Sequence, residues 1–150
     1  MAYANSGILW TPKAHIIHSR SYAGIVALNG KIYVFGGNDP CSPYGEKPNL
    51  YEYDIASDTW TAKADMLNSS TTGMGAVAFG GKVYSIGGAY GLGGALSAVE
   101  VYDPGSNNWT YKGNLPAARG YTAAAVANGK IYLMGGTVSG VSYADRKSVV

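Results

Sequence analysis

The chain has 150 residues, a formal charge of +2, 13% charged residues and 22 glycines. So small a charge argues against a nucleic-acid or acidic-membrane partner, and no stretch approaches the ~20 apolar residues of a membrane span. The glycine content disfavours a helical bundle, because each glycine costs a helix about 1 kcal/mol, and instead suits short strands joined by tight turns.

A repeat of about 50 residues runs along the chain. Its tryptophans, Trp10, Trp60 and Trp109, are 50 and 49 residues apart, and each is followed by Thr and, two residues later, by Lys. A second motif recurs in register with them: Asn29–Gly37 (NGKIYVFGG), Gly80–Gly88 (GGKVYSIGG) and Asn128–Gly136 (NGKIYLMGG). A period near 50 that contains four short strand-like stretches predicts the blade of a β-propeller.

The first predicted strand of each repeat is small and apolar, which suits the crowded innermost position of a propeller. These strands are expected at Tyr22–Leu28, Gly73–Phe79 and Tyr121–Ala127. The two residues after each strand, such as Asn29-Gly30, tolerate the positive φ of a tight hairpin. The sequence therefore predicts that each repeat opens with a hairpin.

The remaining strands of a repeat follow in order. In the first repeat the second strand is expected at Lys31–Phe35 and ends in Gly-Gly, where no side chain obstructs a neighbouring backbone. After a variable loop, the third strand is expected at Leu50–Tyr53, and Asp54 starts the next turn. The fourth begins at Trp60, whose large ring is expected to fill the widening space between blades.

These motifs resemble the kelch family over nearly the whole chain. The resemblance rests on the Gly-Gly pair, the Tyr three residues before it, and the downstream Tyr-Asp and Trp. It implies an all-β, kelch-type propeller fragment: about three four-stranded antiparallel blades forming an open arc of a ring of six or seven. The sequence of these motifs is similar to that of prokaryotic kelch proteins, which are often extracellular. Met1–Trp10 shows no signal peptide, and the lone Cys41 does not indicate the compartment.

The expected blade boundaries follow from the repeat. Trp10–Lys13 is a lone fourth strand that belongs to a preceding blade or closes a ring, and the blades are 20–63, 71–112 and an incomplete 119–150. Two interpretations of the tail stay open. Either Ser148–Val150 begins a third strand, or Asp145–Val150 is an artefact, since a sequence resembling a common sequencing adapter would encode those residues and a stop.

One face of the predicted arc collects the variable loops and the links between blades. We expect a protein, a peptide or a carbohydrate to bind there, through polar and aromatic side chains. The candidate binding residues are Arg20, Asn38, Asp39, Tyr44, Glu46, Lys47, Tyr90 and Arg119. Family members tend to have Arg before the innermost strand, whereas the middle repeat has Thr71. The alternative is that Arg20 and Arg119 tie blades together and that the loops are only solvated.

No catalytic constellation or cofactor site is visible in the sequence. His15 and His18 have no Cys, Asp or Glu cluster beside them, so a metal is not expected. The alternative function is a fragment of a kelch-fold enzyme, either a copper oxidase resembling galactose oxidase or a sialic-acid epimerase. Cys41 lies near Tyr44, but no histidine falls in an innermost strand, which disfavours the copper site. Unpaired blade edges are expected to promote self-association.

Overall fold

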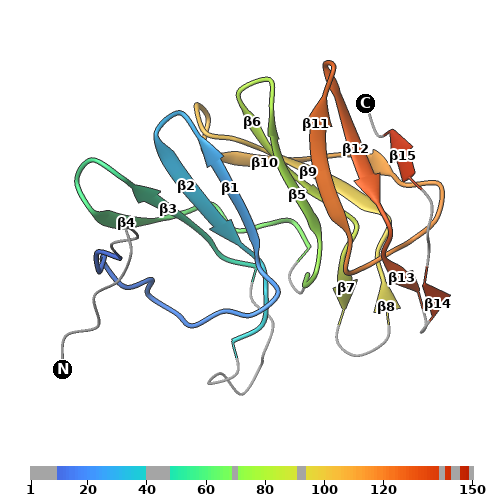
Figure 1. The fold of residues 1–150 in the computed structure, drawn as a ribbon, viewed down its shortest axis with the longest axis horizontal. Coiled ribbons are helices and arrows are strands. Elements are labelled where there is room, and N and C mark those ends of the chain that lie inside the picture. The colour runs from blue at the N-terminus through green and yellow to red at the C-terminus, as the bar shows by residue number, and fades with distance from the viewer. Residues whose placement is uncertain are drawn as a thin grey trace, which may run out of the picture.

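The computed structural model describes residues 10–39, 48–68, 71–90, 94–138, 141–142 and 146–148, and every regular element in these ranges is a β-strand. The predicted all-β fold of antiparallel sheets is confirmed. No helix in the described part of the chain is long and apolar enough to cross a membrane. Figure 1 shows the three larger sheets side by side, with the N-terminal sheet in blue and green and the C-terminal one in orange and red.

The first blade is a four-stranded sheet in sequence order. Its strands are β1 (Gly24–Leu28), β2 (Lys31–Phe35), β3 (Leu50–Asp54) and β4 (Thr59–Lys63). The hairpin between β1 and β2 turns at Asn29 and Gly30, which have φ of 51° and 73°. Both values lie in the left-handed region, which asparagine and glycine tolerate, so the sequence forms the turn without a bulky residue in strain.

The second blade repeats this four-stranded sheet. It consists of β5 (Gly75–Phe79), β6 (Lys82–Ile86), β9 (Ala98–Asp103) and β10 (Asn108–Asn114), in the spatial order β5-β6-β9-β10. Between β6 and β9 the chain forms a small hairpin of β7 (Ala89–Tyr90) and β8 (Gly94–Ala95). This hairpin points away from the blade at the lower edge of Figure 1.

The third blade has three strands among the described residues. They are β11 (Ala123–Ala127), β12 (Lys130–Met134) and β15 (Arg146–Ser148), and a second small hairpin, β13 (Thr137–Val138) and β14 (Val141–Ser142), lies between β12 and β15. Trp10–Lys13 forms no strand here, and Trp10 is 89% exposed. The fourth strand of a blade pairs with the third strand of the same blade. The assignment of Trp10–Lys13 to a preceding blade therefore stays a prediction.

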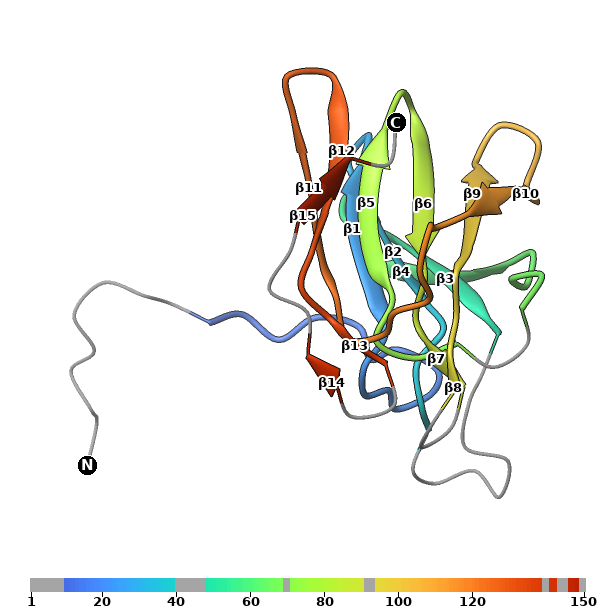
Figure 2. The same ribbon diagram turned by 90° about the vertical axis from the view of Figure 1, so that its right-hand side faces the viewer.

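The innermost strands begin two residues later than the sequence predicted. Tyr22, Gly73 and Tyr121 have φ of 56°, 58° and 56°, and a left-handed residue cannot belong to an extended strand. The strands β1, β5 and β11 therefore start at Gly24, Gly75 and Ala123 and lie next to one another (Figures 1 and 2). The three left-handed residues are left at the ends of these strands, on the side where the links arrive.

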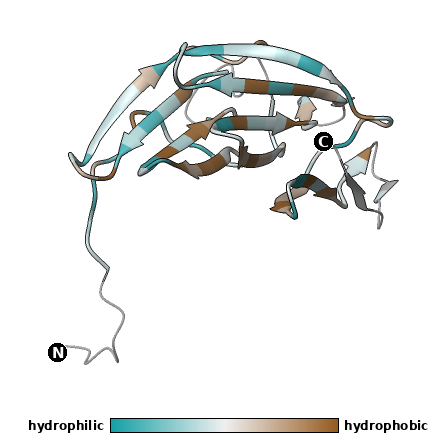
Figure 3. Cartoon of the chain, turned by 90° about the horizontal axis from the view of Figure 1, so that it is seen from above, coloured by the Kyte–Doolittle hydropathy of each residue, from teal (hydrophilic) through white to brown (hydrophobic). Residues whose placement is uncertain are grey.

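The core consists of two layers, one between each pair of neighbouring blades. Figure 3 shows hydrophobic and hydrophilic residues mixed along the strands, and most residues of β3 and β9 are buried. The first layer includes Phe35, Leu50, Met66, Tyr102 and Trp109, all buried. The ring centroids of Phe35 and Trp109 lie 5.5 Å apart, so Trp109 fills the space between blades as predicted. The second layer consists of Val77, Ile86, Val99, Leu115, Ile131 and Leu133.

Candidate ligand-binding face

The loop face is the lower edge of the arc in Figures 1 and 2, and the hairpins β7–β8 and β13–β14 lie there. The links between blades reach the same edge, because isolated bridges join Ser21 to Asn38, Thr72 to Ala89, and Gly120 to Thr137. The topology thus gathers the variable segments of all three repeats on one side. The opposite edge carries the tight hairpin turns of the inner strands.

Arg20 holds the Gly36-Gly37 pair that follows β2 in its own blade. Its Nη1 donates to the carbonyl oxygen of Gly36 at 2.5 Å and to that of Asn49 at 3.3 Å, while its Cζ lies 5.0 Å from the ring centroid of Tyr51. Burial lowers the pKa of the guanidinium, against the opposing effects of Tyr51, Asp39 and Asp65. These hydrogen bonds occupy N–H groups that a ligand would otherwise use. They therefore favour a role for Arg20 in holding the scaffold rather than in binding a ligand.

Arg119 lies in the interior and is 1% exposed. Its Nη1 donates to the carbonyl oxygen of Gly135 at 3.3 Å, the contact that Arg20 makes with Gly36 two repeats earlier. Its backbone carbonyl accepts a hydrogen bond from Gly88 N at 2.9 Å, which joins two blades. In this arrangement the side chain of Arg119 does not reach the surface.

Asn38 and Asp39 anchor the link that precedes the first blade. The backbones of Asn38 and Ser21 exchange two hydrogen bonds, at 2.9 and 2.8 Å. Asp39 is 5% exposed and accepts a hydrogen bond from Ser19 Oγ at 3.0 Å, with His18 Nδ1 3.9 Å from its second oxygen. The half-buried Asn38 borders the loop face, whereas the carboxylate of Asp39 is directed into the link.

The remaining predicted residues divide into two groups. Tyr44, Glu46 and Lys47 lie outside the described residues. Tyr90 is 61% exposed at the end of β7, on the loop face as predicted. Of the five candidates that the structure describes, only Tyr90 is largely exposed.

Two tyrosines that the sequence interpretation assigned to the innermost strands are exposed on this face. Tyr22 is 64% and Tyr121 48% exposed, and their rings lie 5.7 Å apart at an angle of 84°. Gly73, at the equivalent position of the middle repeat, joins their backbones: Gly73 N donates to Tyr22 O at 2.9 Å, and Tyr121 N donates to Gly73 O at 2.6 Å. The register Arg-Ser-Tyr, Thr-Thr-Gly, Arg-Gly-Tyr was the available signal for this site.

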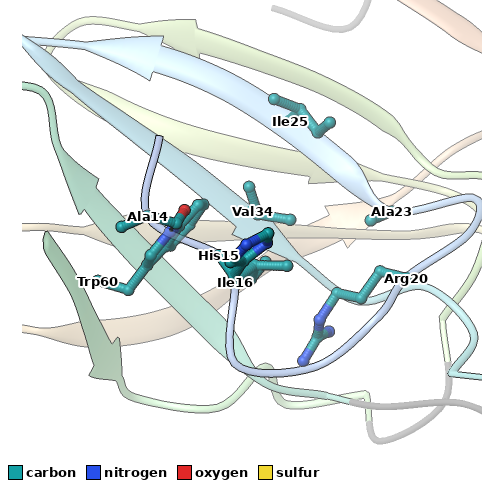
Figure 4. A pocket seen from close by; sticks show the side chains of 8 residues that line it. All are labelled: Ala14, His15, Ile16, Arg20, Ala23, Ile25, Val34 and Trp60. Carbon is teal, nitrogen blue, oxygen red and sulfur yellow. Dashed lines mark hydrogen bonds between the residues drawn. The ribbon is translucent and has the colours of Figure 1, made fainter. Parts of the chain in front are cut away.

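A separate hollow of about 380 Å³ lies against the face of the first blade that is opposite to the first core layer (Figure 4). It is lined by Ala14, His15, Ile16, Arg20, Ala23, Ile25, Val34 and Trp60. Ile25 is 63% exposed there, whereas its equivalent in the second blade, Ala76, packs against the first core layer. This hollow is thus the open counterpart of an interface between blades, and it is not part of the loop face.

Metal-binding side chains do not cluster in the part of the chain that the structure describes. No group of three or more His, Cys, Asp or Glu residues could hold an ion there. His15 lines the hollow beside the first blade, and His18 lies near the buried Asp39. Among its described residues, the face offers aromatic surface and hydrogen-bonding groups.

Comparison with known proteins places this geometry among kelch repeats. Residues 8–147 match the model of the KLHDC2/KLHL20/DRC7 Kelch-repeats domain. Kelch-like protein 25 of Xenopus tropicalis is 31% identical over 133 residues, covering 85% of this chain and 22% of that protein. An F-box/kelch-repeat protein of Arabidopsis thaliana is 34% identical over 115 residues, covering 75% of this chain and 30% of that protein.

A solved structure shares the fold. The structure of YjhT superposes with a TM-score of 0.72 at 17% identity, covering 87% of this chain and 42% of that chain. Beta-scruin of Limulus polyphemus is 31% identical over 140 residues, which are 15% of its length. The chain thus spans less than half the length of each of these proteins.

Proposed function

Since the chain belongs to the kelch-repeat family, we propose that it is a binding module that grips another protein through its loop face. The observation that carries the proposal is the exposure of three tyrosines, Tyr22, Tyr90 and Tyr121, on that face. Tyrosine is enriched at protein interfaces because one side chain offers a large apolar ring and a hydroxyl at little entropic cost.

The positions of Arg20 and Arg119 support binding through aromatic rather than charged side chains. Arg20 is engaged by the carbonyls of Gly36 and Asn49, and Arg119 is buried. The carboxylate of Asp39 is buried as well. These three charged side chains thus stabilise the scaffold, and the three exposed tyrosines are neutral. A protein partner would contribute apolar side chains and backbone hydrogen-bonding groups.

The proposal is tested by selecting displayed random peptides on the immobilised chain. We expect enriched peptides whose affinity falls about tenfold or more in the double variant Tyr22→Ala, Tyr121→Ala, because truncating a central interface tyrosine costs more than about 1 kcal/mol. The matched control is Tyr111→Ala, which removes a tyrosine that is 54% exposed on the outer strand β10. Peptides that bind the double variant as well as the unaltered chain, or no enrichment at all, would refute the proposal.

A carbohydrate partner is the second outcome that the same variants can reveal. Exposed tyrosines also stack against sugars, so a panel of neutral oligosaccharides is screened alongside the peptides. If a sugar binds, if the double variant loses that binding, and if no peptide binds, then the loop face is the binding site but its ligand is a carbohydrate and not a protein. Mixed results are resolved by competition between the two ligands.

A further inference from the structure

We propose that the pair Tyr22 and Tyr121 recognises a proline residue of an extended, uncharged peptide segment. This inference rests on the proposed function, because it names the chemistry that one part of the loop face takes. The pair lies where the innermost strands β1 and β11 begin, so it occupies the inner end of the face.

The two rings form a corner rather than a flat platform. Their planes meet at 84° with centroids 5.7 Å apart, and each tyrosine keeps about half or more of its surface exposed. A corner of two aromatic faces fits a compact, puckered ring, which contacts both at once. A pyranose is larger and carries hydroxyl groups around its ring, which an aromatic corner would leave without hydrogen-bond partners, so the corner favours a pyrrolidine over a pyranose.

The backbone holds the pair in a conformation that bulky residues rarely adopt. Both tyrosines have φ of 56°, in the left-handed region. Apart from the contact between the two rings, these exposed side chains gain little from packing, so the cost is compensated elsewhere in the structure. Such strained, exposed positions concentrate at ligand-binding sites, where they preorganise the contact groups.

Gly73 supplies the compensation and the space. Its backbone hydrogen-bonds to Tyr22 and to Tyr121, which fixes the distance between the two residues. A Cβ atom at Gly73 would lie 2.7 Å from Cδ1 of Tyr121, so a side chain there would push that ring aside. The repeat thus places a glycine between two tyrosines where the corner needs an empty position.

The hydrogen-bonding character of the corner matches proline. Each tyrosine offers a hydroxyl that can donate to a carbonyl oxygen. The residue before proline presents such a carbonyl, while proline has no N–H that would lose a water partner on binding. Proline-rich segments also keep an extended conformation in solution, so little entropy is lost when they dock on aromatic surfaces.

The experiment measures binding of three synthetic ligands by isothermal titration calorimetry. The ligands are a blocked ten-residue oligoproline, a blocked ten-residue peptide of Gly, Ser and Ala, and a neutral linear glucan oligosaccharide. We expect only the oligoproline to bind, and we expect Tyr22→Ala and Tyr121→Ala each to weaken it about tenfold. Tyr22→Phe should keep most of the affinity, because the ring contact remains, and the control Tyr111→Ala should bind normally.

A second variant tests the geometry with both tyrosines present. Gly73→Ala should abolish oligoproline binding by displacing the Tyr121 ring, and its circular dichroism and thermal transition establish that it is folded. Because the left-handed backbone at position 73 would strain an alanine, Tyr22→Ala is measured beside it as a substitution at an exposed side chain that leaves the scaffold intact. A folded Gly73→Ala variant with normal affinity would overturn the proposed corner.

The outcomes separate the two proposals. Displayed peptides that lack proline but need Tyr22 and Tyr121 would refute proline recognition while keeping the protein-binding face. A glucan that needs the same tyrosines, without oligoproline binding, would also refute it. If no ligand depends on any residue of the loop face, both proposals fail together.

Discussion

The indole Nε1 of Trp109 donates a hydrogen bond of 2.9 Å to the carbonyl oxygen of Ala64, which lies in the link that precedes the second blade. Trp60 makes the same bond, also 2.9 Å, to Ala14 in the link before the first blade. Each bond ties the outer strand of a blade to the segment that leads into its innermost strand. Ala64 directly follows β4, so the bond of Trp109 also joins the outer strands of the first and second blades.

This equivalence makes the two tryptophans a matched pair for stability. Trp109→Ala should lower the free energy of unfolding by about 3–5 kcal/mol, because the ring is 3% exposed and packs against Phe35. Trp60→Ala should cost clearly less, since Trp60 is half-buried beside the open hollow yet makes the same hydrogen bond. Urea denaturation measures both, and equal losses would contradict the role given to packing between blades.

The Gly-Gly corners offer a second matched comparison. Gly87 has φ of +64°, and a Cβ atom there would lie 2.5 Å from the carbonyl oxygen of Arg119. Gly80 has a similar φ of +56° in a hairpin turn, with no atom within 4 Å of its would-be Cβ. Gly80→Ala should cost only the left-handed strain of about 1–2 kcal/mol.

Gly87→Ala should cost more than Gly80→Ala, because the backbone of the next link must also move. Thermal and urea unfolding of the two variants measure the difference. If both variants lose the same stability, the close approach of the link is unimportant and the glycine is needed for its φ alone.

Glu100 should make stability depend on pH. Its carboxylate is 2% exposed and accepts hydrogen bonds from Leu67 N at 3.1 Å and Asn68 N at 3.0 Å. Burial raises its pKa above the ordinary value of 4.5, and the hydrogen bonds from Asn68 and Leu67 oppose that rise. A pKa that is higher in the folded state than in the unfolded state gives stability that is present below pH 4.5 and is lost as the pH rises through the folded value.

The measurement compares the unaltered chain with Glu100→Gln at pH 4 and pH 7. The glutamine variant should gain stability relative to the unaltered chain as the pH rises, because it carries no buried charge. Asp54→Asn is the control of opposite sign, since hydrogen bonds from Ser57 and Ala56 lower the pKa of Asp54 despite some desolvation. A difference between Glu100→Gln and the unaltered chain that does not vary with pH would refute the assignment.

The open side of the first blade should promote self-association. Ile25 exposes 63% of its surface at a position whose equivalent in the second blade is packed against a neighbouring blade. We expect light scattering to show association that Ile25→Arg reduces. Ile55→Arg is the control, because Ile55 is 48% exposed in the turn between β3 and β4. A stable monomer before any substitution would show that the open side is tolerated.

Much of the fold follows from local sequence. Asn29-Gly30 and Asn128-Gly129 specify hairpin turns because these residue types tolerate a left-handed backbone, and the structure gives each of the four a positive φ. The repeat spacing of Trp60 and Trp109 likewise predicted two outer strands, β4 and β10. The turns depend on neighbouring residues and the outer strands on a repeated motif, so pattern and spacing are enough to find them.

The candidate site depended on contacts that the repeat pattern alone did not define. Tyr22 and Tyr121 precede runs of small residues and look like strand, but hydrogen bonds to Gly73, some 50 residues from each, hold them out of the strands. Arg119 looks like a rim residue, yet its surroundings leave it 1% exposed. Sequence determined the blades and their turns, whereas only the packing of one blade on the next decided which side chains reach solvent, because burial depends on neighbours distant in the chain.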